Sequence, residues 1–201
     1  MNTIAPQPLF VAGHPAVDFL NTAYAPGGEQ VETLVDGRAL LEWMVGARLL
    51  TEDESAALRR RFSRKALDTA AHEARDVREW ARRWLTAWRA NPARDYSEEL
   101  ESLNKLLARE DRERELVVVK RRLALVDRSR IADASALLAP IAVAIAQLVS
   151  QEDPALVKAC AGADCTLWFL DRTKAHRRMF CSAAACGNRA KVAAFRLRQR
   201  E

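Results

Sequence analysis

The sequence predicts a mainly α-helical protein, in which an N-terminal helical bundle with a small β-hairpin (residues 1–153) precedes a small cysteine-rich module (residues 154–201). Three observations lead to this fold class. Long stretches without Gly or Pro carry apolar residues at helical spacing, which predicts the bundle. All 4 cysteines lie between residues 160 and 186. Between the two parts, Glu152-Asp153-Pro154 ends a helical pattern, so we place the domain boundary there.

The first elements are expected to be short. Residues 9–12 suit an extended segment, and Pro15 stands at the first position of a short helix that runs to Thr22. A loop rich in Pro and Gly follows at residues 24–30. Residues 34–50 then predict an amphipathic helix that ends near Gly46.

The longest helical pattern runs from residue 52 to residue 90. Thr51 and Glu54 have the spacing of a capping box, which marks its start. The pattern contains neither Gly nor Pro, so it predicts either one helix or two helices that meet near Ser63.

Three tryptophans, Trp80, Trp84 and Trp88, are spaced four residues apart and form one stripe on this helix. A tryptophan stripe can stack on bases, but no basic feature is peculiar to this face, so we interpret it as a core or helix seam. Arginines alternate with acidic residues between positions 73 and 89, and we interpret them as a solvated face.

The remainder of the bundle contains one further helix, a hairpin and a final apolar helix. Residues 96–109 predict a helix with four leucines facing inward: Leu100, Leu103, Leu106 and Leu107. Val and Leu dominate residues 115–120 and 123–126, which predicts the β-hairpin. Asp133 can cap the last helix, in which Pro140 either introduces a kink or marks the true start.

The cysteines have the spacing C-x4-C-x15-C-x4-C, formed by Cys160, Cys165, Cys181 and Cys186. Two short-range pairs separated by a loop that can fold back are what a tetrahedral zinc site needs. Two disulfides are a weaker interpretation, because no secretory signal precedes them, and four unrelated thiols would not be expected to cluster in this way. Since all four ligands come from the protein, we expect one structural Zn²⁺ and no open catalytic position.

The residues around the cysteines predict the shape of the module. Residues 167–170 and 179–180 are apolar and flank a polar turn, which predicts a strand, a turn and a strand between the two pairs. Residues 189–199 lack Gly and Pro and predict a helix. This order is that of a treble-clef-like zinc finger, with the positive end of the helix dipole beside the thiolates.

Two motifs resemble known families. Cys186-Gly187-Asn188-Arg189 followed by Ala190-Lys191, with its arginine-rich tail, closely resembles the bacterial CGNR zinc finger over residues 158–201. The run Gly13-His14-Pro15-Ala16-Val17-Asp18-Phe19-Leu20-Asn21-Thr22 is similar to the opening of the ABATE domain, in which a Gly, an Asp and an Asn-Thr pair recur. The resemblance implies a stress-induced transcriptional regulator, for which DNA binding follows largely from the basic character of the finger.

The charge of the chain is asymmetric. The net charge is +5, yet residues 158–201 carry ten Lys or Arg against three Asp or Glu. This predicts an anionic partner for the finger, a nucleic acid first (DNA, with RNA as an alternative) and a membrane surface second, although a basic tail that only aids solubility has the same composition. The expected contacts are six basic residues: Arg177, Arg178, Arg189, Lys191, Arg196 and Arg200.

Two alternatives stay open within the finger helix. On a helical wheel Arg189, Arg196 and Arg200 share one face, while Val192 and Phe195 share another that suits packing on the aromatic hairpin. Arg189 and its neighbour Asn188 lie so close to the metal that they either contact nucleic acid or support the cysteine ligands.

His14, Asp18 and Asn21 are candidate polar residues of the bundle. They could line a pocket for a small-molecule effector, with His14 as a titratable neighbour. Polar residues beside a short buried helix more often satisfy loop backbone groups, and we favour that interpretation.

The expected function is a DNA-binding regulator whose N-terminal domain senses an effector or forms a homodimer. The alternative is a zinc-stabilised scaffold that binds other proteins. An enzyme is not expected, because the chain has no phosphate-binding glycine loop and no nucleophile motif. Residues 1–10 do not resemble a signal peptide, and the longest apolar run, residues 134–149, is shorter than the roughly 20 residues that span a bilayer. We therefore expect a soluble cytoplasmic protein.

Overall fold

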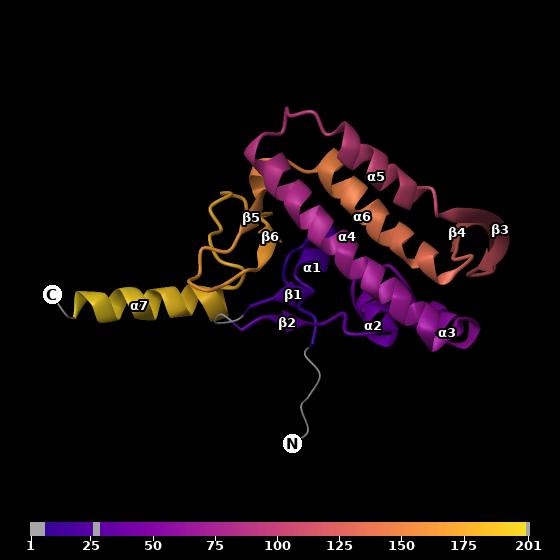
Figure 1. Cartoon of the computed structure of the whole chain (residues 1–201), viewed down its shortest axis with the longest axis horizontal. Coiled ribbons are helices and arrows are strands. Elements are labelled where there is room, and N and C mark those ends of the chain that lie inside the picture. Colours follow the sequence, from indigo (N-terminus) through magenta and orange to yellow (C-terminus); the bar gives the residue numbers. More distant parts are fainter. Residues whose placement is uncertain (1–6, 26–28, 200–201) are drawn as a thin grey trace, which may run out of the picture.

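The computed structural model describes residues 7–25 and 29–199, and it is mainly α-helical, as the sequence predicts (Figure 1). A helical body is followed by a small cysteine-rich finger from which the last helix projects. The elements of the body are α1 (Pro15–Leu20), β1 (Ala23–Tyr24), β2 (Val31–Glu32), α2 (Gly37–Gly46), α3 (Glu52–Arg61), α4 (Arg64–Ala90), α5 (Ser97–Leu107), β3 (Asp111–Val119), β4 (Arg122–Arg130), η1 (Ala134–Leu137) and α6 (Leu138–Gln151). The elements of the finger are η2 (Pro154–Leu156), β5 (Val157–Ala159), β6 (Trp168–Leu170), the π-helical turn η3 (Ala183–Gly187) and α7 (Asn188–Arg198).

The long helix α4 is the axis of the body, with α1, α2, α5 and α6 arranged along it (Figure 1). Thr51 and Glu54 form the predicted capping box of α3, and Ser63 caps α4, so the long pattern is two helices that meet at Ser63. Trp84 and Trp88 are buried, and Trp80 packs against the core with its ring centroid 5.3 Å from that of Trp84. The tryptophan stripe is therefore a core seam.

One arginine of the supposed solvated face is buried. Arg78 is 3% exposed and makes two hydrogen bonds to the Glu32 carboxylate, at 2.9 and 2.6 Å, and one to Thr22 Oγ1 at 3.0 Å. The prediction that this arginine is solvated was wrong, because β2 folds back over α4 and supplies a carboxylate that the local sequence does not contain.

The apolar helix α6 lies in the core. Asp133 caps η1 by accepting from the backbone N–H groups of Ser135 and Ala136, and Pro140 stands in the first turn of α6, where its missing N–H group breaks no helical bond. In the described part of the chain, Ala134–Gln151 is the helical segment long and apolar enough to suit a bilayer, with a mean hydropathy of 1.6. Its Ile141 and Ile145 are fully buried in the body, which accounts for this composition.

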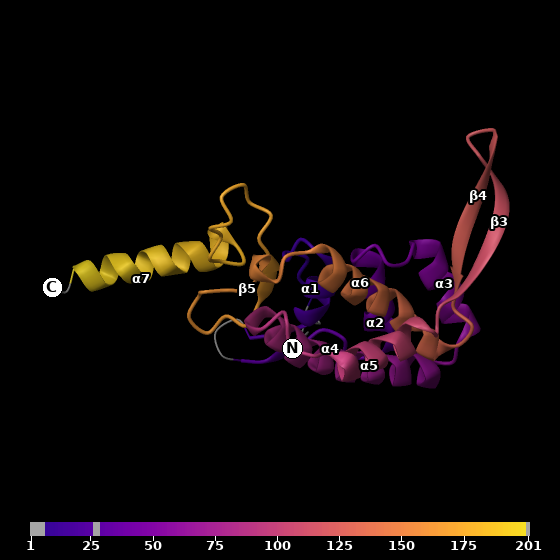
Figure 2. The ribbon, with the colours of Figure 1, turned by 90° about the horizontal axis from the view of Figure 1, so that it is seen from above.

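The β-hairpin is longer than predicted and stands away from the helices (Figure 2). Strands β3 and β4 pair from Val119↔Arg122 at the tip to Asp111↔Arg130 at the base. Lys120 and Arg121 form the turn with φ values of 49° and 65°.

Of the four leucines predicted to face inward on α5, Leu100 is 47% exposed, so that part of the prediction was wrong.

The strand pairing of the finger also differs from the prediction. β6 pairs with β5, in the register Val157↔Leu170, and not with residues 179–180. The hairpin therefore encloses the first cysteine pair and does not lie between the two pairs. The error arose because residues 167–170 and 179–180 are both apolar, whereas the real partner strand precedes the first cysteine.

Candidate metal centre and basic helix

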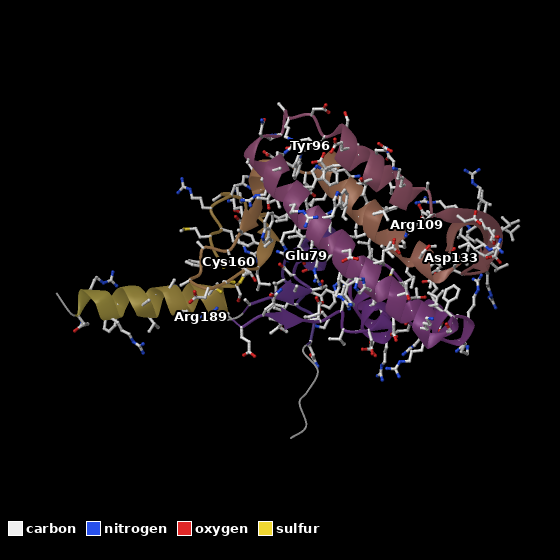
Figure 3. All side chains as sticks on the ribbon, viewed as in Figure 1. Glu79, Tyr96, Arg109, Asp133, Cys160 and Arg189 are labelled. Carbon is white, nitrogen blue, oxygen red and sulfur yellow. The ribbon has the colours of Figure 1, made fainter. Side chains whose placement is uncertain are left out.

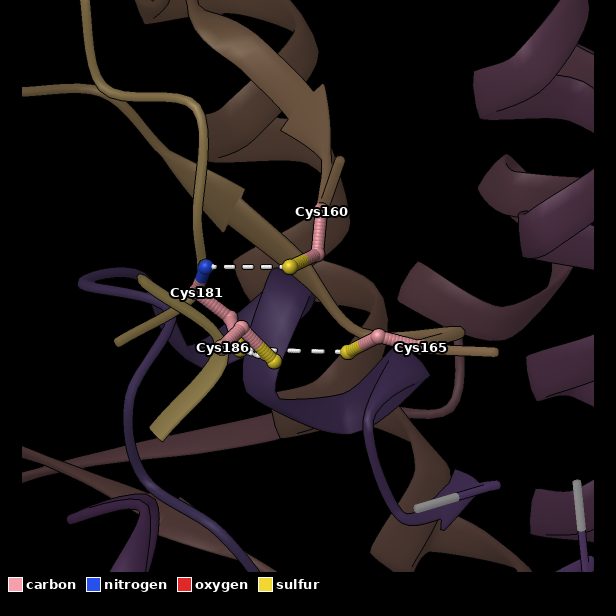
Figure 4. Close-up of side chains that lie close together, drawn as sticks. All are labelled: Cys160, Cys165, Cys181 and Cys186. Atoms are coloured by element: carbon pink, nitrogen blue, oxygen red, sulfur yellow. Dashed lines mark hydrogen bonds between the residues drawn. The ribbon is translucent and has the colours of Figure 1, made fainter. Parts of the chain in front are cut away.

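The four cysteine sulfurs converge on one point (Figure 4). Their Sγ atoms all lie within 4.8 Å of one another, and the four cysteines are free thiols. Cys160, Cys181 and Cys186 are buried, and Cys165 is half-buried. Four sulfurs at mutually similar distances match the corners of a tetrahedron around one ion, whereas two disulfides would require two much closer pairs.

Each pair is positioned by a short backbone turn. Cys160 follows β5, and its N–H group donates to the Leu167 carbonyl oxygen at 2.8 Å, which closes the knuckle around Cys165. Cys186 lies in the π-helical turn η3, whose N-terminus is capped by the side chain of Ser182. The sulfur of Cys160 accepts from the N–H groups of Gly162 at 3.4 Å and Cys181 at 3.3 Å, and such bonds stabilise thiolate charge.

The electrostatics of the thiols indicate that a cation belongs between them. Burial raises the pKa of Cys165 to about 11, and burial also raises the pKa of Cys181. For Cys186, burial acts in the same direction but is outweighed by hydrogen bonds from Arg189 and the neighbouring thiols, so its pKa is lowered. Crowded thiols that cannot all ionise alone become thiolates when a divalent cation is bound. The set holds one structural Zn²⁺, with no position left for a catalytic water.

Helix α7 begins directly at this centre and projects away from the body (Figures 1 and 2). Arg189 lies in its first turn (Figure 3). Its Nη2 atom donates to the Cys186 sulfur at 3.0 Å, which favours the interpretation that this residue supports the cysteine ligands. Lys191 and Arg196 are exposed, and Arg200 lies outside the described residues.

The apolar face of α7 does not pack as predicted. Val192 and Phe195 are 48% and 56% exposed. The prediction that they pack on an aromatic hairpin was wrong, because the strands of the finger pair on the side facing the body and α7 extends past them.

Two family models match the chain. The ABATE family, whose description is "putative stress-induced transcription regulator", matches residues 13–152. The chain belongs to the ABATE family. The CGNR zinc finger matches residues 157–199, so both predicted resemblances are confirmed in the predicted order. No curated protein matches the chain.

Within the CGNR finger, the two adjacent arginines of the turn have different surroundings. Arg177 is exposed, whereas the guanidinium of Arg178 lies 4.2 Å from the ring centroid of Phe169. Arg178 also donates to the carbonyl oxygens of Phe180 at 3.0 Å, Val11 at 3.3 Å and Cys181. The contacts of Arg178 hold the knuckle to the N-terminal segment and leave little of its guanidinium group free to contact a nucleic acid.

Asp171 is a further structural residue of the finger, which its sequence places at the start of a polar turn. Its fully buried carboxylate accepts from Lys158 Nζ at 2.7 Å, from Thr173 Oγ1 at 2.6 Å and from the Arg178 N–H group at 2.9 Å. Burial opposes ionisation, but these donors outweigh it and hold the pKa of Asp171 well below its usual range. The signal in the sequence that could have identified Asp171 is its position immediately after a buried strand.

The motif residues of the ABATE domain bond to backbone groups. His14 Nδ1 accepts from the Ala16 N–H group at 3.2 Å as the cap of α1, and Asp18 Oδ1 accepts from the Ala12 N–H group at 2.9 Å. Burial lowers the pKa of His14 and raises that of Asp18 to about 6. These contacts support the capping interpretation over the effector pocket.

Asn21 joins the ABATE domain to the finger. Its Nδ2 atom donates to the Trp168 carbonyl oxygen and its Oδ1 atom accepts from the Trp168 N–H group, both at 2.8 Å. The Leu170 N–H group donates to the Ala12 carbonyl oxygen at 2.8 Å, and Arg89 lies 4.7 Å from the Trp168 ring centroid. Trp168 and Leu170 belong to the same hydrophobic core as the helices, so strand β6 of the finger is part of the core of the body.

Proposed function

We propose that this protein is a cytoplasmic transcriptional regulator that binds DNA through α7, and that it has no catalytic activity. The observation that carries the proposal is the geometry of α7. It is a helix that projects from the body with its N-terminus fixed at the metal centre and contains four Lys or Arg and no acidic residue. A free helix of this charge fits the major groove, where arginine contacts phosphates and guanine edges.

The surface of α7 supports close approach to a nucleic acid. A hollow of about 550 Å³ lies beside α7 and the η3 turn, and its lining includes three alanines and two arginines. Its lining residues are Ala184, Ala185, Asn188, Arg189, Val192, Ala193 and Arg196. We assign Lys191, Arg196 and Arg177 as contacts and Arg189 as a residue that holds the helix at the metal. Arg200 remains a predicted contact.

A scaffold that binds other proteins is the second candidate. The exposure of Val192 and Phe195 on the same helix favours it, because exposed apolar side chains that cluster mark protein partners. The two candidates place different residues of α7 at the contact, so substitutions can separate them.

The test is fluorescence anisotropy with a random duplex across a salt series. The variant Lys191→Ala/Arg196→Ala is compared with Arg59→Ala/Arg60→Ala, which removes the same charge from exposed positions of α3. We expect the wild type to bind with a log-log salt slope of roughly −3 to −5, and the α7 variant to lose about two units of that slope, because each phosphate contact contributes about 0.9. The α3 variant should behave as the wild type does.

Two results would contradict binding of DNA through α7. If the wild type fails to bind at about 50 mM salt, where phosphate binding is strong, α7 is not a nucleic-acid helix. Equal losses in the α7 and α3 variants would show that binding depends only on net charge. The same series with single-stranded and duplex RNA distinguishes the class of nucleic acid.

A further inference from the structure

A hollow of about 310 Å³ lies at the seam between the helical body and the finger. Its lining comes from three segments: Glu79 and Arg82 of α4, residues 23–25 and Gln30 of the β1–β2 hairpin, and Thr166 of the finger. The Ala25 N–H group donates to Thr166 Oγ1 at 2.9 Å and joins the hairpin to the finger here. We call this space the seam hollow. Its volume is that of a small-ligand site, for which about 300 Å³ is the lower end.

Arg82 is the cation of the seam hollow, and its guanidinium is held in a fixed position. Its Nη2 atom donates to the carbonyl oxygens of Leu20, at the end of α1, and of Ala23 at 3.3 Å. The side chain is 23% exposed, so most of it is shielded from water. Among the described residues, no group accepts from its Nη1 atom, and the Glu79 carboxylate lies 3.6 Å from its Nε atom. Part of the donor set of this guanidinium is therefore without an acceptor.

The charges around Arg82 do not balance. Three arginines on one face of α4, Arg75, Arg78 and Arg82, lie beside two carboxylates, Glu32 and Glu79. Both carboxylates bond to Arg78, so Glu79 is shared between two guanidinium groups. Burial lowers the pKa of Arg82 more than Glu79 raises it, whereas the bonds of Arg78 raise its pKa despite its burial. A cation that is desolvated without a full partner favours an anion at its open edge.

We propose that the seam hollow binds a small monocarboxylic acid with an apolar body, whose carboxylate accepts from the open edge of Arg82. One negative charge matches the one uncompensated positive charge, and a planar carboxylate matches the fork of a guanidinium. The side chains of Ala23, Tyr24 and Ala25 provide a wall for the apolar body. The Thr166 oxygen already accepts from the Ala25 N–H group, so its own hydrogen is available to donate to the ligand.

Glu79 limits the charge of the ligand. Its side chain is 46% exposed and lines the same hollow, so its carboxylate repels a dianion more strongly than a monoanion. A phosphate group carries about −1.5 to −2 charges at neutral pH, which exceeds the single uncompensated charge of the arginines. The hollow should therefore prefer a monocarboxylate to a phosphate or a dicarboxylate.

The seam hollow lies beside the metal centre of the finger. Thr166 directly follows the metal ligand Cys165, and helix α7 begins at the same centre. A bound carboxylate would touch both α4 and this knuckle. A regulatory role for the ligand rests on the proposed DNA binding, whereas the binding of a carboxylate does not. Because its measurement contains no nucleic acid, the two proposals fail independently.

The experiment is isothermal titration calorimetry of the full, zinc-loaded chain at neutral pH and constant ionic strength, with benzoate as the probe. We expect saturable binding with a dissociation constant of about 1 mM or below, a range that a small ligand with one ion pair reaches. Benzamide has the same shape without the charge and should bind about tenfold more weakly, because hydrogen bonds between charged groups contribute more. Phthalate, a dianion, and inorganic phosphate should also bind more weakly than benzoate.

Two variants locate the site. Arg82→Gln should weaken benzoate binding about tenfold or more, because it removes the charged donor. The matched control Arg83→Gln removes the same charge from the next residue of α4, which is exposed, and should bind benzoate as the wild type does. Glu79→Gln keeps an acceptor for Arg78 but removes the repelling charge, so it should bind benzoate several-fold more tightly and discriminate less against phthalate.

Three results overturn the proposal: no saturable benzoate binding up to about 10 mM, equal affinities for benzoate and benzamide, and equal losses in Arg82→Gln and Arg83→Gln. Tighter binding of inorganic phosphate than of benzoate rejects the assignment to a carboxylate. Arg82 also bonds to the end of α1, so its replacement affects folding as well as the hollow. If Arg82→Gln does not fold, Glu79→Gln decides, and unchanged or weaker benzoate binding in that variant overturns the proposal.

Discussion

The helical body and the zinc finger are stabilised by different interactions. The body has a large core of fully buried side chains such as Phe19, Trp43 and Leu137. The separate core of the finger contains Leu167, Phe169 and three of the cysteines, and buried polar contacts to Asp171 surround it. Stability is therefore distributed over many apolar contacts in the body and concentrated in one ion and a few hydrogen bonds in the finger. A single substitution should have different consequences in the two regions.

Replacement of a metal ligand should have the largest effect. Cys181→Ser is expected to abolish zinc binding, because structural zinc contributes about 10–16 kcal/mol of apparent binding free energy in zinc-finger peptides. Helix α7 and the η3 turn should lose protection in hydrogen exchange, whereas α4 and α6 keep theirs. The amides of Trp168 and Leu170 should also stay protected, because they bond to residues of the body.

Ala163→Ser is the control for that experiment, since it places the same residue in the exposed part of the knuckle without touching a ligand. It should retain one zinc per chain by mass spectrometry. An ordered α7 in a metal-free Cys181→Ser protein would contradict the view that the ion holds the finger together.

A core substitution in the body should have the next largest effect, and it should destabilise the body while the metal centre of the finger stays intact. Leu137→Ala leaves a cavity at a fully buried position and should lower the free energy of unfolding by about 2–5 kcal/mol. Leu100→Ala, at a 47% exposed position, should cost far less. Urea denaturation measures both, and the folded Leu137→Ala protein should still bind one zinc. Equal costs at the two positions would argue against this core.

Breaking the junction should cost less than opening the core. Asn21→Ala leaves the buried N–H and carbonyl groups of Trp168 without partners, and should lower the free energy of unfolding by roughly 2 kcal/mol. Asn104→Ala, an exposed position of α5, is the matched control. Faster hydrogen exchange confined to the β6 amides in Asn21→Ala would locate the effect at the junction, and unchanged exchange there would sink the idea that Asn21 joins the two regions.

The features that the sequence predicts are local or carry their own chemistry. The cysteine spacing predicts the metal centre, and Thr51 with Glu54 predicts the start of α3, because each set of partners lies within a short stretch or is specific by residue type. One error arose where the partner is distant, because Glu32, which pairs with Arg78, lies 46 residues away. The strand pairing was wrong for another reason: β5 and the apolar residues 179–180 are similarly close to β6 in the sequence.

Arg177 and Arg178 show the same limit within one dipeptide. The sequence gives no reason to treat them differently, yet the guanidinium of Arg178 contacts Phe169 and Val11, while Arg177 is exposed. The difference depends on the tertiary position of Phe169 and of the N-terminal segment. Only the fold brings those partners to one arginine and not to its neighbour.

The smallest predicted effect concerns two buried carboxylates whose pKa values move in opposite directions. In the body, burial raises the pKa of Asp18 to about 6, so the folded state binds a proton more tightly than the unfolded chain does, and this group favours folding as the pH falls from 7 to 5. In the finger, the pKa of Asp171 is lowered, so its contribution to stability is present above the ordinary carboxylate pKa and is lost as the pH falls further.

The difference in free energy of unfolding between the wild type and Asp18→Asn should therefore shift by about 1 kcal/mol in favour of the wild type between pH 7 and pH 5. Measuring the difference by urea denaturation cancels the titration of the zinc ligands, which both proteins share. If the difference in free energy of unfolding does not change over this range, Asp18 is solvated. The two carboxylates would then not distinguish the body from the finger.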